Sequence, residues 1–410
     1  MAFKNLPSRA WIVGSTLFVF AIVIGLIYYT GTMTPKFRID DETRKLTNYD
    51  SWPQYDRKIA FLPPNAKSRS VVLLHAYVPF WNAGSEICCH TVNKLLVERG
   101  HEVWVGVPGY PYKTYEGVHI FDLNDREMLH GLMKHTDVIS THSYREKAIK
   151  LSHRYGVAFV DWFHGGTYTA KAKDAGALND SPRYWAIFNS DSLLASFSEI
   201  HETRYHILRP PVNWRDYEIS QGSNPQYVTL SNLNENKGGQ ILIDIAKAAP
   251  EIQFLGVRGS YWKQIEDHSV PNIKYMNNTP RIKDVYAMTK ILIMPSKDET
   301  WGRTAIEAMS SGIPVIASPT PGLRECCETS ALFVERFDIA EWVRLLRRLL
   351  NDQSFYDEYS NRGKIRARQL EPTHDLEMFQ EWYETKVIVS TDRKTAIKPT
   401  LFEEYYDRFA

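Results

Sequence analysis

Residues 290–328 read KILIMPSKDETWGRTAIEAMSSGIPVIASPTPGLRECCE, and this stretch decides how the rest of the chain is interpreted. Residues 291–294 are a short apolar run without a polar gap, as expected of a strand buried on both faces of a parallel sheet. Gly302 is predicted to open a helix, and Gly312 is well placed to end it in the left-handed conformation. Residues 315–317 indicate the next buried strand. Ligands of such strand–loop–helix–strand units bind beyond the carboxyl ends of the strands.

The loop between the first strand and the helix is rich in polar residues. Asp298, Glu299 and Thr300 lie just before the helix, whose first N–H groups make a ready site for an anion. Glu307 lies within the second turn of the same helix. One carboxylate is therefore expected to face a pocket beside a bound phosphate, while the other reaches back along the helix to a hydroxyl-rich ligand.

The two glutamates also carry a family resemblance. Glu299 and Glu307, with seven residues between them in ETWGRTAIEAMSSGIPVIAS, resemble the E-x7-E signature of retaining GT-B glycosyltransferases of family 4. The alternative is an amphipathic surface helix with two solvated glutamates. The glycine, the EAM-x-x-G-x-P-V pattern and the following PGLRE agree with the resemblance. It implies an α/β fold of two Rossmann-like domains that face a cleft, with a nucleotide-sugar donor held mainly by the second.

Length, charge and cysteine content narrow the class of protein. A chain of 410 residues is long enough for two globular domains. The net charge of +1 implies no strong field for nucleic acid. The four cysteines form two adjacent pairs, at 88–89 and 326–327, without a C-x-x-C pattern. Burial as small apolar groups is favoured over a zinc site, which would need both pairs to converge, and over a disulfide scaffold.

The N-terminal region predicts a membrane anchor. Residues 10–30 are uncharged and mostly apolar, long enough for one helix to cross a bilayer, and they follow a short tail at 1–9. A cleaved signal peptide is the alternative, but the run is long for one. Basic residues on the two sides favour a catalytic domain that faces the cytoplasm. Residues 31–68 are polar and interrupted by prolines, so they are predicted to be a stem.

The first Rossmann-like domain is assigned to residues 69–215. Gly84 follows the first strand and resembles the glycine-rich loop of the family, although an ordinary turn is the alternative. His164 follows a later strand, at a position where a family histidine points at the transferred sugar; a structural hydrogen-bonding role is the alternative. The predicted strands of this domain are 70–74, 102–107, 137–141, 158–161 and 186–189.

The second domain is assigned to residues 216–390, with its boundary near 213–225. SNLNENKGG follows its first strand and resembles the family pattern G-R-L-x-x-x-K-G, whose arginine and lysine clamp the donor diphosphate. Lys237 matches the lysine, whereas Asn232 occupies the arginine position and supplies no positive charge. Arg303 and Arg258 are the candidates to replace that charge, and for Arg303 a surface arginine is the alternative.

The resemblance also implies roles for these side chains. Glu307 would bind the ribose and Glu299 hydroxyls of the transferred sugar. Lys237, with N–H groups near Gly302, Arg303 and Thr304, would stabilise the departing diphosphate. No D-x-D motif occurs, so neither a metal nor a cofactor is expected. The helix at 375–387 is expected to cross back to the first domain, ahead of a tail at 391–410.

These observations predict a membrane-anchored retaining glycosyltransferase. It would move a sugar from a nucleotide-diphosphate sugar to a glycan or lipid-linked acceptor, without a nucleic-acid partner. A GT-B sugar-nucleotide epimerase or phosphorylase is one alternative, although no signal for a separate phosphate site is found. A non-catalytic donor-binding scaffold is the other, with Asn232 as a sign of lost activity.

Overall fold

The computed structural model describes residues 44–396, apart from residue 46 and residues 166–180, 198–203 and 220–223. No helix in this described part is long and apolar enough to cross a membrane. The predicted tail at 1–9 and the predicted anchor at 10–30 lie outside the described residues. The two lobes described next belong to one packed unit.

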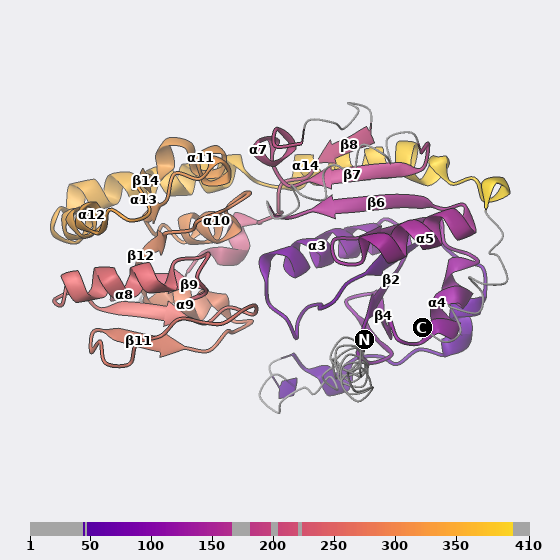
Figure 1. The fold of residues 1–410 in the computed structure, drawn as a ribbon, viewed down its shortest axis with the longest axis horizontal. Coiled ribbons are helices and arrows are strands. Elements are labelled where there is room, and N and C mark those ends of the chain that lie inside the picture. The colour runs from indigo at the N-terminus through magenta and orange to yellow at the C-terminus, as the bar shows by residue number, and fades with distance from the viewer. Residues whose placement is uncertain (1–43, 46, 166–180, 198–203, 220–223, 397–410) are drawn as a thin grey trace, which may run out of the picture. The chain divides into compact units, whose positions relative to one another are not determined.

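The first lobe is built on a sheet with the strand order β3-β4-β2-β1-β5-β6-β7-β8 (Figure 1). Neighbouring strands are parallel except β3 and β4, which are antiparallel. Short apolar runs such as β1 are buried along their whole length, as in a sheet covered on both faces. The strands are β1 (Arg69–Leu73), β2 (Glu102–Val107), β3 (Lys113–Tyr115), β4 (Val118–Asp122), β5 (Val138–Thr141), β6 (Ala158–Phe163), β7 (Tyr184–Phe188) and β8 (Tyr205–Ile207).

Helices connect the parallel strands of this lobe. Asp125 caps α4 by accepting a hydrogen bond from the N–H of Met128, and Gly156 ends α5 in the left-handed conformation. The helices are α3 (Gly84–Glu98), α4 (Arg126–Met133), α5 (Arg145–Tyr155) and α7 (Asp191–Leu194). All five strands predicted for this lobe are confirmed, whereas β3, β4 and β8 were not predicted.

The second lobe holds a wholly parallel sheet with the order β11-β10-β9-β12-β13-β14. Its strands are β9 (Tyr227–Ser231), β10 (Phe254–Val257), β11 (Ile273–Met276), β12 (Thr289–Met294), β13 (Val315–Ala317) and β14 (Leu332–Phe333). Its helices are α8 (Gly239–Ala248), α9 (Ile282–Met288), α10 (Arg303–Ser310), α11 (Pro321–Cys327), α12 (Ile339–Asn351) and α13 (Gln353–Gln369). The strand–helix–strand unit predicted at 291–317 is confirmed.

The strand orders locate the ligand-binding edge of each sheet. From β9 the chain proceeds outward to β10 and β11, and from β12 it proceeds the opposite way to β13 and β14. The order therefore reverses between β9 and β12, and in the first sheet it reverses between β1 and β5. Open α/β sheets bind ligands at the carboxyl ends of the strands beside such a reversal. The loops after β9 and β12 carry Lys237 and Glu299.

The C-terminal segment returns to the first lobe, as predicted. It begins with α14 (Thr373–Trp382) and continues through Tyr383–Val387 and Ile388–Ser390. Trp185 donates its indole N–H to Ser390 Oγ at 2.8 Å, and the N–H of Asp392 donates to the carbonyl of Gly156 at 3.0 Å. The predicted tail at 391–410 is therefore wrong at its start, because its first residues are hydrogen-bonded to the first lobe.

The second half of the predicted stem also packs on the first lobe. Tyr49–Ser51 and Arg57–Phe61 form short 3-10 helices, and Ala60 of the second one is fully buried in the core of the first lobe. Trp52 is 8% exposed, and Tyr55 donates its hydroxyl proton to the carbonyl of Ile120 at 2.6 Å. The prediction of a linker over 31–68 is wrong for the part that includes Trp52 and Tyr55, because this part packs on the first lobe. Its aromatic side chains follow no period in the sequence, since each one contacts a different neighbour.

Candidate active site

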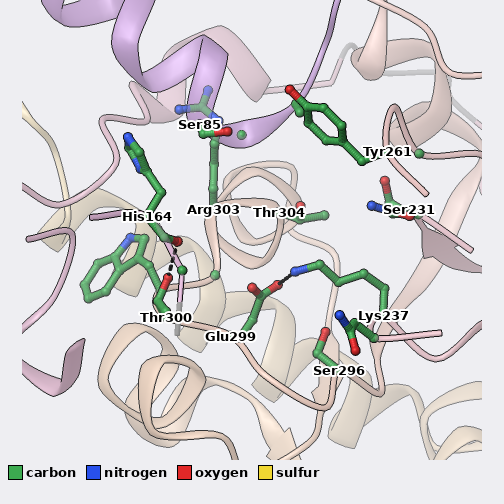
Figure 2. A pocket seen from close by; sticks show the side chains of 18 of the residues that line it. Ser85, His164, Ser231, Lys237, Tyr261, Ser296, Glu299, Thr300, Arg303 and Thr304 are labelled. Carbon is green, nitrogen blue, oxygen red and sulfur yellow. Dashed lines mark hydrogen bonds and ion pairs between the residues drawn. The ribbon is translucent and has the colours of Figure 1, made fainter. Parts of the chain in front are cut away.

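A cavity of about 350 Å³ lies between the two lobes, at the carboxyl ends of both sheets. The first lobe contributes Asn82, Gly84, Ser85, His164 and Asn189, and the second contributes Ser231, Asn232, Lys237, Ser260, Tyr261, Asp298, Glu299, Thr300, Gly302 and Thr304. Most of the side chains predicted to act on a donor are therefore brought together (Figure 2).

An ion pair on the cavity wall joins the two loops of the second sheet. Lys237 Nζ lies 2.6 Å from Glu299 Oε1, and both side chains line the cavity (Figure 2). Their side chains are 26% and 17% exposed, so a ligand in the cavity has access to both. A lysine ammonium is a strong partner for phosphate oxygens, and a carboxylate accepts hydrogen bonds from hydroxyl groups. The pair therefore offers one site for an anion directly beside one for a polyol.

The turn before α10 (Arg303–Ser310) requires glycine. Gly302 has φ +139°, and a Cβ placed on it would lie 2.8 Å from Leu323 Cδ2. The turn brings the first N–H groups of α10 to the cavity, where Thr304 is a lining residue. Because the first N–H groups of a helix have no partner within it, they are available to an anionic ligand.

The predicted phosphate contact of Arg303 is not supported by the geometry. Its guanidinium is buried, with Nε 2.7 Å from Glu307 Oε1, and it donates to the carbonyl of Pro211 and to Tyr217 Oη. Tyr286 donates its hydroxyl proton to Glu307 Oε2 at 2.7 Å. Arg303 therefore serves to orient Glu307, and its own donors are directed to the protein.

The structure gives no support to the donor-binding prediction for Arg258. Its guanidinium binds both carboxylate oxygens of Glu266 at 2.6 and 2.7 Å and Asn277 Oδ1 at 2.7 Å, and it is not among the residues that line the cavity. Asn232 does line it, in a left-handed conformation with φ +74°. A Cβ on Gly259 would lie 2.2 Å from Asn232 Cγ, so the amide packs closely over that glycine.

Gly84 lies at the first residue of α3, where the two lobes approach each other. A Cβ on it would meet only Arg303 Cδ, at an ordinary 3.7 Å. The packing of the protein itself therefore tolerates a side chain at this position. Because glycine has no side chain, the backbone at position 84 is exposed on the cavity wall. This exposure is what the predicted close approach of a ligand to the backbone requires.

His164 lines the cavity, but its imidazole points away from Glu299 and Lys237 (Figure 2). The ring stacks on Trp162 with a centroid distance of 4.9 Å, and Nε2 lies 3.9 Å from Cys89 Sγ. Burial lowers the pKa of His164 to about 3, so the ring is neutral at physiological pH. Its carbonyl oxygen accepts the hydroxyl proton of Thr300 at 2.8 Å, which links the lobes.

Two further hydrogen bonds connect the lobes and were not predicted. Tyr261 donates its hydroxyl proton to Glu86 Oε1 at 2.5 Å, although 175 residues separate them. Asn189 donates Nδ2 to Thr300 Oγ1 at 2.8 Å. The only signal in the sequence was the position of Glu86, a carboxylate two residues after Gly84 in a helix that is otherwise apolar there.

Comparison with known proteins gives evidence on function that is independent of this geometry. Residues 213–366 match the family described as Glycosyl transferases group 1. The uncharacterized glycosyltransferase MJ1607 of Methanocaldococcus jannaschii is 24% identical over 359 residues, which cover 70% of this chain and 90% of that protein. The D-inositol 3-phosphate glycosyltransferase 1 of Catenulispora acidiphila is 33% identical over 75 residues, 18% of each chain. The chain is a glycosyltransferase.

Solved structures show that the glycosyltransferase has a GT-B-like fold. Anabaena Alr3699/HepE, solved with UDP and glucose, superposes with a TM-score of 0.64 at 16% identity, covering 78% of this chain and 100% of that one. Sucrose-phosphate synthase of Thermosynechococcus elongatus gives the same TM-score and identity, covering 78% and 99%. The predicted α/β architecture is thereby confirmed. The group 1 match covers the second lobe, including Lys237, Glu299 and Glu307.

Proposed function

We propose that this glycosyltransferase is a retaining enzyme of family 4 that uses a nucleotide-diphosphate sugar as donor. The observation that carries the proposal is the Lys237–Glu299 pair on the cavity wall, with Glu307 eight positions further along the chain from Glu299 and buried behind it. An amphipathic surface helix with solvated glutamates would leave Glu307 exposed, whereas it is 6% exposed and paired with Arg303.

The donor is proposed to extend through two adjoining hollows. The second, of about 320 Å³, shares Gly84, Ser231, Arg303 and Thr304 with the first and reaches Glu307. Its other lining residues include apolar Val257, Pro280 and Ile282. In this arrangement the nucleoside lies beside Glu307, which accepts ribose hydroxyls, and the sugar lies beside Glu299. The diphosphate joins them, at Lys237 and the first turn of α10.

In the proposed reaction the bond between the anomeric carbon and the diphosphate breaks, and the acceptor oxygen bonds to the same face of the sugar. The acceptor proton passes to the departing phosphate. Negative charge develops on the diphosphate, and Lys237 with the N–H groups of Arg303 and Thr304 is placed to stabilise it. The proposed transfer step uses no metal and no cofactor. UDP is the first nucleotide to test, because it is present in the HepE complex.

Residues 10–30 are proposed to anchor the enzyme to a membrane, with the catalytic lobes facing the cytoplasm. The support is the uncharged apolar run of the sequence. An enzyme held at a membrane surface has ready access to lipid-linked or membrane-delivered glycans, which are the proposed acceptors.

The test is the release of nucleotide by the full-length protein from UDP-, GDP- and ADP-sugars. Wild type is expected to hydrolyse one donor slowly without an acceptor, and Glu299→Ala is expected to reduce the rate by about 10²–10³-fold. The anomeric configuration of the freed sugar, followed by NMR at early times, should match that of the donor. Donor binding without turnover in any acceptor mixture would favour the scaffold, and conversion to another nucleotide sugar would favour an epimerase.

A further inference from the structure

Three metal-ligating side chains of the first lobe converge beside the active-site cavity. Cys89 Sγ lies 3.5 Å from His142 Nδ1 and 3.9 Å from His164 Nε2. The three ligand atoms all lie within 4.8 Å of one another. A tetrahedral zinc ion with ordinary bond lengths would hold a sulfur and a nitrogen about 3.6 Å apart. The two sulfur–nitrogen distances in the protein are therefore close to that value.

The backbone fixes this spacing. Cys89 lies on α3, His142 follows β5, and His164 follows β6. Strands β5 and β6 are neighbours with a regular parallel register, so their carboxyl ends present the two histidines side by side. Cys89 is 1% exposed and His142 is 7% exposed, so both are held by their surroundings. The adjacent Cys88 does not belong to the group.

A buried carboxylate lies behind one of the histidines. Glu86 is fully buried, and its Oε1 lies 3.5 Å from His142 Nε2, on the opposite side of the ring from Cys89. Tyr261 and Ser85 donate hydroxyl protons to the same carboxylate. The other ring nitrogen of His142, Nδ1, is the one that contacts the sulfur of Cys89. A carboxylate behind a ligating histidine is the usual support of a protein-bound zinc ion.

The charges of the group balance around a divalent cation. Because a metal ion binds the thiolate form of cysteine, ligation would deprotonate Cys89, and Cys89 and Glu86 would then carry two negative charges beside the ion. Buried charges are stable only when they are paired or bound to a metal. One divalent ion between Cys89 and the two neutral imidazoles would make the assembly neutral.

We propose that Cys89, His142 and His164 bind one divalent transition-metal ion of the zinc type, supported by Glu86. Thiolate and imidazole ligands select such ions over magnesium or calcium. His164 also lines the cavity, so the proposed site lies beside the cavity wall. The ion joins α3 to the carboxyl ends of β5 and β6 and fixes the ring of His164. This site is additional to the proposed transfer step and does not depend on it.

The test uses the full-length protein purified without metal-affinity resin. After dialysis against zinc and then against buffer, mass spectrometry of the metal content is expected to give about one zinc per chain. Cys89→Ser should lose this ion, whereas Cys88→Ser, which changes the adjacent buried cysteine, should retain it. Circular dichroism shows whether each variant is folded.

Cobalt binding is measured on the wild type, so this second test does not depend on whether a variant folds. Protein stripped with chelator and then given Co²⁺ is expected to show a thiolate-to-cobalt charge-transfer band and visible bands of tetrahedral cobalt. Absence of both zinc and this band would overturn the proposal. Retention of zinc in Cys89→Ser would overturn it as well.

Discussion

Gly302 and Gly84 both line the cavity, but we expect their substitutions to have different effects on the stability of the protein. Gly302 has φ +139° and no room for a Cβ, since Leu323 Cδ2 would lie 2.8 Å away. Gly302→Ala is therefore expected to lower the free energy of unfolding by about 2 kcal/mol. Gly84 has room for a Cβ, and Gly84→Ala is expected to change that free energy by less than about 0.5 kcal/mol.

Gly84→Ala is expected to affect donor binding rather than stability. Because Gly84 faces the cavity, Gly84→Ala is expected to raise the donor KM, with its thermal midpoint unchanged. Urea unfolding and donor kinetics on both variants provide the measurement. Equal loss of stability in the two variants would show that Gly84 is retained for packing.

Lys237, Glu299 and Gly302 line the cavity, as their positions beside a strand end and a helix start predicted. The roles predicted for them stay predictions. Arg303 also lines the cavity, but the contacts of its guanidinium could not be predicted, because its partners Pro211 and Tyr217 lie 92 and 86 positions away. No pattern in the neighbouring sequence indicates such a partner. An arginine at the start of a helix is equally well placed to bind a phosphate.

Among the elements, long apolar runs were predictable and short irregular ones were not. Strands β3 and β4 span only three and five residues around a tight turn at Gly117, where φ is +83°. The segment that includes Trp52 and Tyr55 has no period because each aromatic residue is buried by a different neighbour. These elements depend on contacts with distant parts of the chain, which a local pattern does not contain.

The C-terminal crossing depends on Glu384, which accepts hydrogen bonds from Lys67 Nζ and His101 Nε2 of the first lobe, both at 3.0 Å. Burial alone would raise the pKa of Glu384, but hydrogen bonds from Lys67, His101 and Gln380 outweigh it and lower the pKa below 4.5. A lowered carboxyl pKa stabilises the folded state above the unfolded-state value, and this contribution is lost as the pH falls through the folded-state value.

Glu384→Gln is therefore expected to reduce the free energy of unfolding by about 1 kcal/mol at neutral pH. The difference from wild type should disappear as the pH falls below 4.5, because the protonated acid then resembles the amide. Urea unfolding at several pH values measures it. Glu377→Gln, an exposed position on the preceding helix α14, is the control and should match wild type throughout. A difference that persists at pH 3 would indicate a role for Glu384 other than its charge.

At the scale of the whole molecule, the two lobes are linked by polar contacts that surround the cavity. Thr300 Oγ1 accepts from Asn189 and donates to the carbonyl of His164. Thr300→Val keeps the shape of the side chain and removes both bonds. The expected result is a donor KM about fivefold higher, the equivalent of about 1 kcal/mol, with little change in kcat.

Steady-state kinetics with the donor that wild type hydrolyses measures this effect. Thr329→Val, an exposed threonine of the second lobe, is the matched control. An unchanged KM in Thr300→Val would mean that the contacts between the lobes at this position do not affect donor binding.

The central claim is that Lys237 binds the diphosphate of a nucleotide sugar, and calorimetric titration of UDP into the full-length protein tests it most directly. Lys237→Ala is expected to weaken UDP binding at least tenfold, because it removes a charge-assisted contact to phosphate. Lys297→Ala, an exposed lysine of the same loop as Glu299 that does not line the cavity, should bind as wild type does. Equal affinity of wild type and Lys237→Ala for UDP would contradict the account.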